Sequence, residues 1–244
     1  MLPFWIALQF LSSLPVHLSG GMPSPQALGR SLLCYPLVGL LFGAVLCGLN
    51  TLLADAPLML HAALLLSVWV VLSGGLHLDG LADSADAWLG GFGDRERTLT
   101  IMKDPRSGPM AVVVLVLVLL LKFCALLALI ELHRSVVLLI VPLIGRSALL
   151  AVFLTTPYVR AGGLGQALAD NLPRRSGWWV LGVSALMCWA LAGITGVWAL
   201  GLATLGFVAL RSVMMRRLGG TTGDTAGALL ELLEVLVLVG LALS

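Results

Sequence analysis

Charged side chains are scarce in this sequence. Asp, Glu, Lys and Arg make up only 11% of its 244 residues, whereas hydrophobic residues make up 59%. This composition, with a mean hydropathy of +1.06, excludes an ordinary water-soluble domain. The net charge of +2 is too small to indicate a nucleic-acid partner. Repeats and low-complexity segments are also absent, so we expect a single integral membrane catalytic domain over residues 1–244.

Cysteine is scarce as well. Cys34, Cys47, Cys124 and Cys188 stand singly within apolar stretches, without the close spacing of a thiolate metal site. We therefore expect small core residues and no cysteine-bound metal. Three of the four histidines are similarly isolated, and only His77 stands in a polar motif.

Long apolar runs are abundant, and about 20 apolar residues suffice to cross a bilayer. The sequence contains six such runs, at 31–53, 57–76, 109–130, 136–154, 178–210 and 228–243. The run at 178–210 is too long for one span, and Gly193 and Gly196 indicate a tight turn within it. We therefore predict an all-α, polytopic integral membrane protein with about seven transmembrane helices.

The positive charges support this division. Cytoplasmic loops of membrane proteins carry an excess of Lys and Arg. With seven spans, 11 of the 14 basic residues fall on one side and only Arg134 falls on the other. If 178–210 were one helix, eight basic residues would fall on one side of the membrane and four on the other. We therefore expect the C-terminus on the far side and three cytoplasmic segments, 77–108, 155–177 and 212–227.

The first fifteen residues, MLPFWIALQFLSSLP, form an apolar run that is too short for a span and lacks the basic start of a signal peptide. We predict an interfacial or re-entrant helix that ends at Pro15. The glycines and prolines of 17–29 then predict a loop.

The first polar motif is HLDGLADSADAWLGG at 77–91. On a helix, the four- and three-residue spacings put Asp79, Asp83 and Asp86 on one face. Three neighbouring carboxylates repel one another unless a cation lies between them, and oxygen ligands suit Mg²⁺. The alternative is a solvated acidic helix start. His77 points roughly opposite to Asp79, so a metal ligand, a phosphate donor and a structural cap all remain open for it.

The second polar motif is GDRERTLTIMKDPRSGP at 93–109. Lys103 and Arg106 stand in a tight turn before a span, where they could hold diphosphate oxygens. Asp104 between them could be a further metal ligand, or it could pair with a neighbouring base. The acids and bases at the start of this motif could equally form ordinary ion pairs on a solvated helix.

The third polar motif is LGGTTGDTAGALLELLE at 218–234. Its glycines allow a close backbone approach, and its threonines could cap a following helix. Asp224 and Glu231 are seven residues apart and share a helical face, with Glu234 three residues further on. Acids within a span are costly and suggest a functional site. We expect Asp224 to complete the same site as the 77–86 segment, either as a metal ligand or by orienting an attacking hydroxyl.

Two bases also fall within predicted spans, Lys122 and Arg146. Arg146 is a candidate for binding a substrate phosphate. The alternative is that Lys122 and Arg146 form internal ion pairs with Glu231 and Glu234.

The three motifs, read as HLDGLADSADAWLGG, IMKDPRSGPMAV and GGTTGDTAGALLELLE, together resemble the cobalamin synthase family, also called adenosylcobinamide-GDP ribazoletransferases. The N-terminal ALQFLSSLPV and the YPLVGLLFG at 35–43 resemble the family's opening, so the similarity covers nearly the whole chain. Family members often read GLADTADG at the first motif. This sequence has Ser84 and Ala87 there, two small changes that spare the three aspartates.

The resemblance implies a multi-pass enzyme of the bacterial cytoplasmic (inner) membrane with its active site facing the cytoplasm. The enzyme would join adenosylcobinamide-GDP to α-ribazole, or to α-ribazole 5′-phosphate, and release GMP. A ribose hydroxyl would attack the phosphorus on the cobinamide side, while Mg²⁺, or Mn²⁺ in its place, neutralises the diphosphate. The lipid bilayer is a further expected partner, and a homo-oligomer is compatible with the sequence.

Residues of all three motifs then receive expected roles. The expected catalytic residues are Asp79, Asp83, Asp86 and Asp224. The expected phosphate-binding residues are His77, Lys103, Arg106 and Arg146. The expected metal ligands are Asp79, Asp83, Asp86, Asp104, Asp224 and Glu231.

Three other functions fit the sequence less well. The spaced aspartates loosely resemble those of CDP-alcohol phosphotransferases, which are membrane enzymes with analogous chemistry. A prenyltransferase would have a compact DDxxD run, which is absent. A secondary transporter would have two similar halves and acids near the midplane. The sequence shows no internal similarity, and its acids gather in motifs expected on the cytoplasmic side.

Overall fold

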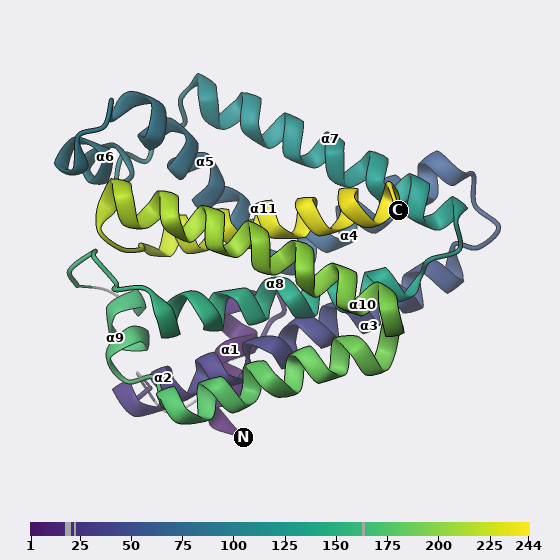
Figure 1. The fold of residues 1–244 in the computed structure, drawn as a ribbon, viewed down its shortest axis with the longest axis horizontal. Coiled ribbons are helices and arrows are strands. Elements are labelled where there is room, and N and C mark those ends of the chain that lie inside the picture. The colour runs from purple at the N-terminus through teal and green to yellow at the C-terminus, as the bar shows by residue number, and fades with distance from the viewer. Residues whose placement is uncertain (18–20, 22, 163) are drawn as a thin grey trace.

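The computed structural model describes residues 1–17, 21, 23–162 and 164–244. Within them the chain is helical, and the only β-type pairing is an isolated bridge between Tyr158 and Thr221. The predicted all-α fold is therefore confirmed. The helices (Figure 1) are α1 (Leu2–Leu11), α2 (Pro25–Ser31), the short 3₁₀ turn η1 (Leu32–Cys34), α3 (Tyr35–Leu52), α4 (Leu58–Ser73), α5 (Leu76–Gly90), α6 (Arg95–Ile101), α7 (Pro109–Glu131), α8 (Val136–Thr155), α9 (Leu164–Asp170), α10 (Arg174–Leu218) and α11 (Gly223–Ala242).

The number of membrane-length segments agrees with the sequence. In the described part of the chain, five helical runs are long and apolar enough to span a bilayer: Pro25–Leu52, α7, α8, α10 and α11. The bent pair of α4 and α5 is a sixth candidate. Because α10 consists of two arms, counting each arm separately gives the predicted total of seven.

The break in α10 lies where the glycines predicted it. Gly193 has φ 53° and ψ −129°, which is outside the helical region and readily adopted only by glycine. The backbone of Gly196 then lies directly against the carbonyl of Cys188, where a Cβ would collide. The 45-residue helix therefore doubles back on itself as a hairpin (Figure 1).

A second break separates α4 from α5. Gly74 and Gly75 both have left-handed backbones, with φ of 62° and 70°, and the two helices meet at a bend of 86°. The predicted span 57–76 therefore ends earlier, at Ser73, and the acidic motif occupies a helix of its own.

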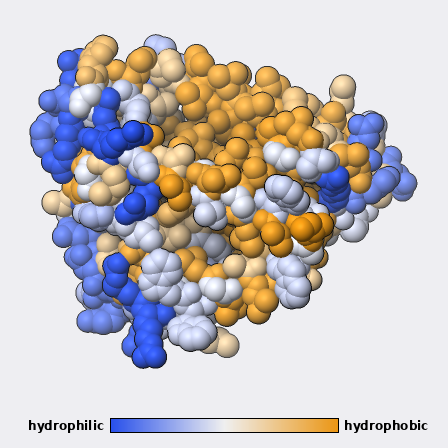
Figure 2. Space-filling model, in the orientation of Figure 1, coloured by the Kyte–Doolittle hydropathy of each residue, from blue (hydrophilic) through white to orange (hydrophobic). Residues whose placement is uncertain are grey.

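Two helices form the centre of the bundle. Most of α8 and α11 is buried, whereas α7 and α10 present long apolar faces to the outside. Figure 2 shows this apolar surface as a broad band between hydrophilic ends, as expected for a protein surrounded by lipid. The larger hydrophilic region lies at the end of the bundle that carries α6 and α9 (Figures 1 and 2).

The N-terminal helix α1 is short, as predicted. Its ten residues cannot cross a bilayer, and Ala7 and Leu11 are buried in the core that includes α3 and α8. Where α1 lies relative to the membrane surface stays a prediction. The loop expected at 17–29 is shorter than predicted, because Ser24 caps α2, which begins at Pro25; residues 18–20 and 22 of that loop lie outside the described part.

Candidate active site

Helix α5 carries the three aspartates of the first motif, as the spacing predicted. Asp79 is exposed and Asp83 is half-buried. The carboxylates of Asp79, Asp86 and Asp224 all lie close enough to Asp83 to interact with it electrostatically. The helix therefore gathers carboxylates at one end of the bundle, next to α11.

Glycines let α5 and α11 approach at backbone distance. A Cβ built at Gly80 would lie 2.8 Å from the carbonyl oxygen of Asp224 and 3.0 Å from its Cα. One turn along α11, a Cβ at Gly227 would lie 3.2 Å from the Cα of His77. Because no side chain separates the two backbones, the first and third motifs meet although about 140 residues separate them.

A cavity of about 190 Å³ opens at this contact. Its polar lining comes from both motifs and from Tyr158, and its apolar lining comes from α1, α3, α8 and α9. The lining residues from the two motifs are His77, Asp79, Gly80, Gly223, Asp224, Ala226 and Gly227, and Leu76 directly precedes the first motif. Pockets for drug-sized ligands have about 300–1,000 Å³. This cavity can therefore hold only part of a large substrate, such as its phosphates.

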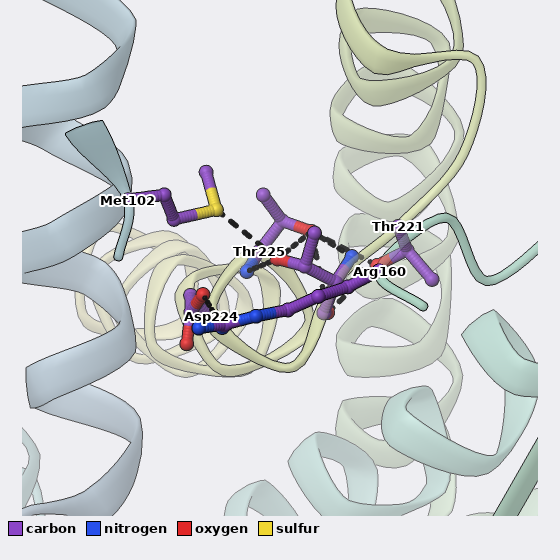
Figure 3. Close-up of polar contacts among 6 residues, drawn as sticks. Met102, Arg160, Thr221, Asp224 and Thr225 are labelled. Atoms are coloured by element: carbon purple, nitrogen blue, oxygen red, sulfur yellow. Dashed lines mark hydrogen bonds and ion pairs between the residues drawn. The ribbon is translucent and has the colours of Figure 1, made fainter. Parts of the chain in front are cut away.

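Asp224 begins the last helix and forms an ion pair with Arg160. Arg160 Nη1 donates to Asp224 Oδ2 at 2.7 Å (Figure 3). Helix α11 is held at this point by a capping box, in which Thr222 and Thr225 each accept the other's backbone N–H. Arg160 was not among the expected site residues, because it lies outside the three polar motifs.

Asp86 lies on the same helix but has different partners. Its carboxylate accepts the backbone N–H of Gly108 at 2.5 Å and that of Ala111 at 3.0 Å. It therefore caps the N-terminus of α7, where free N–H groups need acceptors. Each oxygen of Asp86 accepts one of these hydrogen bonds, so Asp86 has a structural role. Its expected catalytic and metal-binding roles stay predictions.

The second motif forms helix α6 and then an exposed turn that carries Lys103 and Arg106. Arg106 donates two side-chain hydrogen bonds to Asp104, at 2.9 and 2.7 Å, and lowers the pKa of that carboxyl to about 2. This is the pairing with a neighbouring base that the sequence left open for Asp104. Lys103 is exposed and, like Arg106, is not among the residues that line the cavity.

Four buried charges form a cluster between α7, α8 and α11. Lys122 donates to Glu231 at 2.6 Å and to Glu234 at 2.7 Å. Arg146 donates to Glu234 from the other side. All four side chains are at most 5% exposed. Lys122 also packs over Trp69, and Arg146 packs over Phe42.

This cluster gives a structural role to two residues that were expected in the site. Glu231 was expected to bind metal, and one oxygen of its carboxylate pairs with the Lys122 ammonium. Arg146 was expected to bind phosphate, and it is fully buried and pairs with Glu234. These are the internal ion pairs that the sequence offered as the alternative, since charges in an apolar bundle must be neutralised locally. The metal and phosphate roles stay predictions.

His77 lines the cavity and is only 4% exposed. Its Nδ1 is buried and has no hydrogen-bond partner among the described residues. Helix α5 has no side-chain cap, so a structural cap is the least supported of the three alternatives for His77.

Asp79, Asp83 and Asp224 are the carboxylates best placed for a divalent cation. Their oxygens are the donors that Mg²⁺ prefers. In the described residues, no three metal-ligating side chains are already gathered at coordination distance. Arg160 engages Oδ2 of Asp224, so an ion that used this oxygen would need Arg160 to move away.

These features define an α-helical, multi-pass membrane protein with an acidic cavity at its larger hydrophilic end. The sequence model of the cobalamin-5-phosphate synthase family matches residues 3–242. The chain therefore belongs to this family, which confirms the resemblance, and it is a transferase of cobalamin biosynthesis. The match leaves no support for a CDP-alcohol phosphotransferase, a prenyltransferase or a transporter.

The chain is similar in sequence to known proteins over its whole length. Proteins named adenosylcobinamide-GDP ribazoletransferase from Pseudomonas fluorescens, Pseudomonas syringae pv. syringae and Pseudomonas putida are 75%, 72% and 68% identical to this chain. Each match covers 100% of both proteins. No solved structure matches the chain.

Proposed function

We propose that the cavity between α5 and α11 is the active site of an adenosylcobinamide-GDP ribazoletransferase. The reaction joins adenosylcobinamide-GDP to α-ribazole or its 5′-phosphate and releases GMP. The observation that carries this proposal is the contact of Gly80 with Asp224, since it makes one acidic wall from two distant motifs. The relatives' shared name supports the choice of substrates.

The reaction forms one P–O bond and breaks another. A ribose hydroxyl loses its proton and attacks the phosphorus on the cobinamide side of the diphosphate, and GMP departs with the electrons of the broken bond. Mg²⁺, when bound, supplies positive charge to the diphosphate. Asp79 and Asp83 would hold it, and Mn²⁺ could replace it.

The chain's own groups position the reactants. Asp224 could accept the hydroxyl proton or bind the ion, because it lines the cavity together with Asp79. His77 lines the same cavity and could bind a phosphate oxygen.

The activity can be tested directly. Purified protein in liposomes should release GMP only when adenosylcobinamide-GDP, a ribazole acceptor and Mg²⁺ or Mn²⁺ are all present. Omitting the acceptor is the control for simple hydrolysis. Equal GMP release with and without acceptor, or with the metal chelated, would contradict the proposed transfer.

The active site should face the cytoplasm of the bacterial inner membrane. The bases of the predicted cytoplasmic segments lie at the end of the bundle that carries the cavity, for example Arg160 and Arg217. The positive-inside tendency then favours this orientation.

Labelling of single cysteines tests this orientation. In a background without the four native cysteines, thiols introduced at positions 95, 174 and 216 should resist an impermeant reagent in intact cells. They should react after the cells are opened. A thiol introduced at Ser244, which lies at the opposite end of the bundle (Figure 1), should react from outside and serves as the control. Labelling of any of the first three in intact cells would refute the orientation.

A further inference from the structure

Arg160 lies in a segment whose backbone is anchored to the start of α11. Val159 N–H donates to the carbonyl of Thr221 at 2.9 Å, and Thr221 N–H donates to the carbonyl of Pro157 at 2.8 Å. Gly220 packs directly against Pro157 as well, where a Cβ would collide. The backbone before Arg160 is therefore held in place, while its long side chain reaches across to Asp224 (Figure 3).

The contact between Arg160 and Asp224 is a single hydrogen bond. Only Nη1 of Arg160 has a hydrogen-bond partner in the part of the chain that the structure describes. Arg106, by contrast, engages Asp104 through two nitrogens. A guanidinium carries five donors, so most of those of Arg160 are free for another acceptor.

Exposure also separates Arg160 from the other bases near the acidic wall. Its side chain is 32% exposed and that of Asp224 is 19% exposed. Lys122 and Arg146 are at most 3% exposed and are held by glutamates. Arg160 does not itself line the cavity, but it contacts Asp224, which does. Its partly exposed side chain can change partner at small cost.

The charges around Arg160 create a conflict that a substrate would resolve. The carboxylates of Asp79, Asp83 and Asp224 repel one another electrostatically, and the positive charge of Arg160 attracts both Asp83 and Asp224. While Arg160 holds Asp224, that carboxylate cannot bind a metal ion with the same oxygen. A diphosphate that arrives with Mg²⁺ offers a more highly charged, bidentate partner to the guanidinium.

We propose that Arg160 exchanges partners during the reaction cycle, from the Asp224 carboxylate to the diphosphate of the corrinoid substrate. This inference rests on the proposed function. In the free enzyme, the ion pair keeps both groups in place. On binding, Arg160 holds the phosphate oxygens, and the released Asp224 becomes available to the metal ion or to the attacking hydroxyl.

Equilibrium binding of adenosylcobinamide-GDP to the protein in nanodiscs tests the phosphate contact. Arg160→Gln should weaken binding about ten- to hundredfold, as the loss of a charge-assisted hydrogen bond implies. Arg160→Lys should recover part of the loss, since it keeps the charge but not the fork. Arg175→Gln is the matched control, because Arg175 is an exposed base at the start of α10. Binding by Arg160→Gln within twofold of this control would overturn the proposal.

Metal-free binding tests the exchange itself. Without Mg²⁺, Asp224→Asn should bind the substrate up to about fivefold more tightly than the unchanged protein, because Arg160 no longer has a competing carboxylate. The gain should disappear when Arg160→Gln is added. If it persists in the double variant, it reflects only the removed negative charge, and the exchange is wrong.

The two proposals can fail separately. An unchanged protein that does not release GMP would contradict the proposed function. Normal GMP release, combined with unchanged substrate binding by Arg160→Gln, would contradict the exchange alone.

Discussion

Asn in place of Asp79 or Asp83 should lower the rate of GMP release by about two orders of magnitude or more. Each change keeps the side-chain size but removes a negative charge, at Asp79 from the cavity wall and at Asp83 from the next turn of the same helix. Neither aspartate side chain makes a hydrogen bond among the described residues, so both variants should insert and fold normally. The loss should therefore appear in turnover and in the Mg²⁺ concentration needed for it.

The control for these variants is Asp55→Asn. Asp55 is an exposed acid in the turn between α3 and α4, outside all three motifs. It should retain normal turnover and metal dependence. Near-normal GMP release by both the Asp79 and Asp83 variants would remove these residues from the metal site.

Met in place of Lys122 should destabilise the protein by about 3–5 kcal/mol. The change leaves Glu231 without its buried partner and leaves Glu234 with Arg146 alone. A carboxylate in the apolar centre of the bundle has no water to replace the ammonium. Denaturant unfolding in detergent micelles should therefore have a lower midpoint for this variant than for the unchanged protein.

Adding Glu231→Gln to Lys122→Met should recover much of this loss, since the cluster then has no net charge. Lys103→Met, at an exposed position, is the matched control for stability and should have little effect. A double variant as unstable as the single one would show that packing, and not charge balance, makes Lys122 important.

Local properties of the sequence determined most of the fold. Apolar runs of bilayer length predicted the spans, because each backbone group in lipid must be satisfied within its own helix. Gly193 predicted the hairpin of α10, because its φ of 53° is readily adopted only by glycine. The helical spacing of Asp79, Asp83 and Asp86 likewise predicted their shared helix. These features depend on neighbouring residues and so can be recognised without a partner.

The tertiary structure alone decided which charges meet. Asp86 and Asp83 stand in the same motif, yet Asp86 caps α7 because the packing of α7 against α5 brings two N–H groups to it. Glu231 could have faced a metal ion or a base, and the register of α11 against α7 places it against Lys122. Arg160 carries no local signal and gains its role from the contact with Asp224. Charge pairing acts over a few ångströms across helices, and only their packing sets those distances.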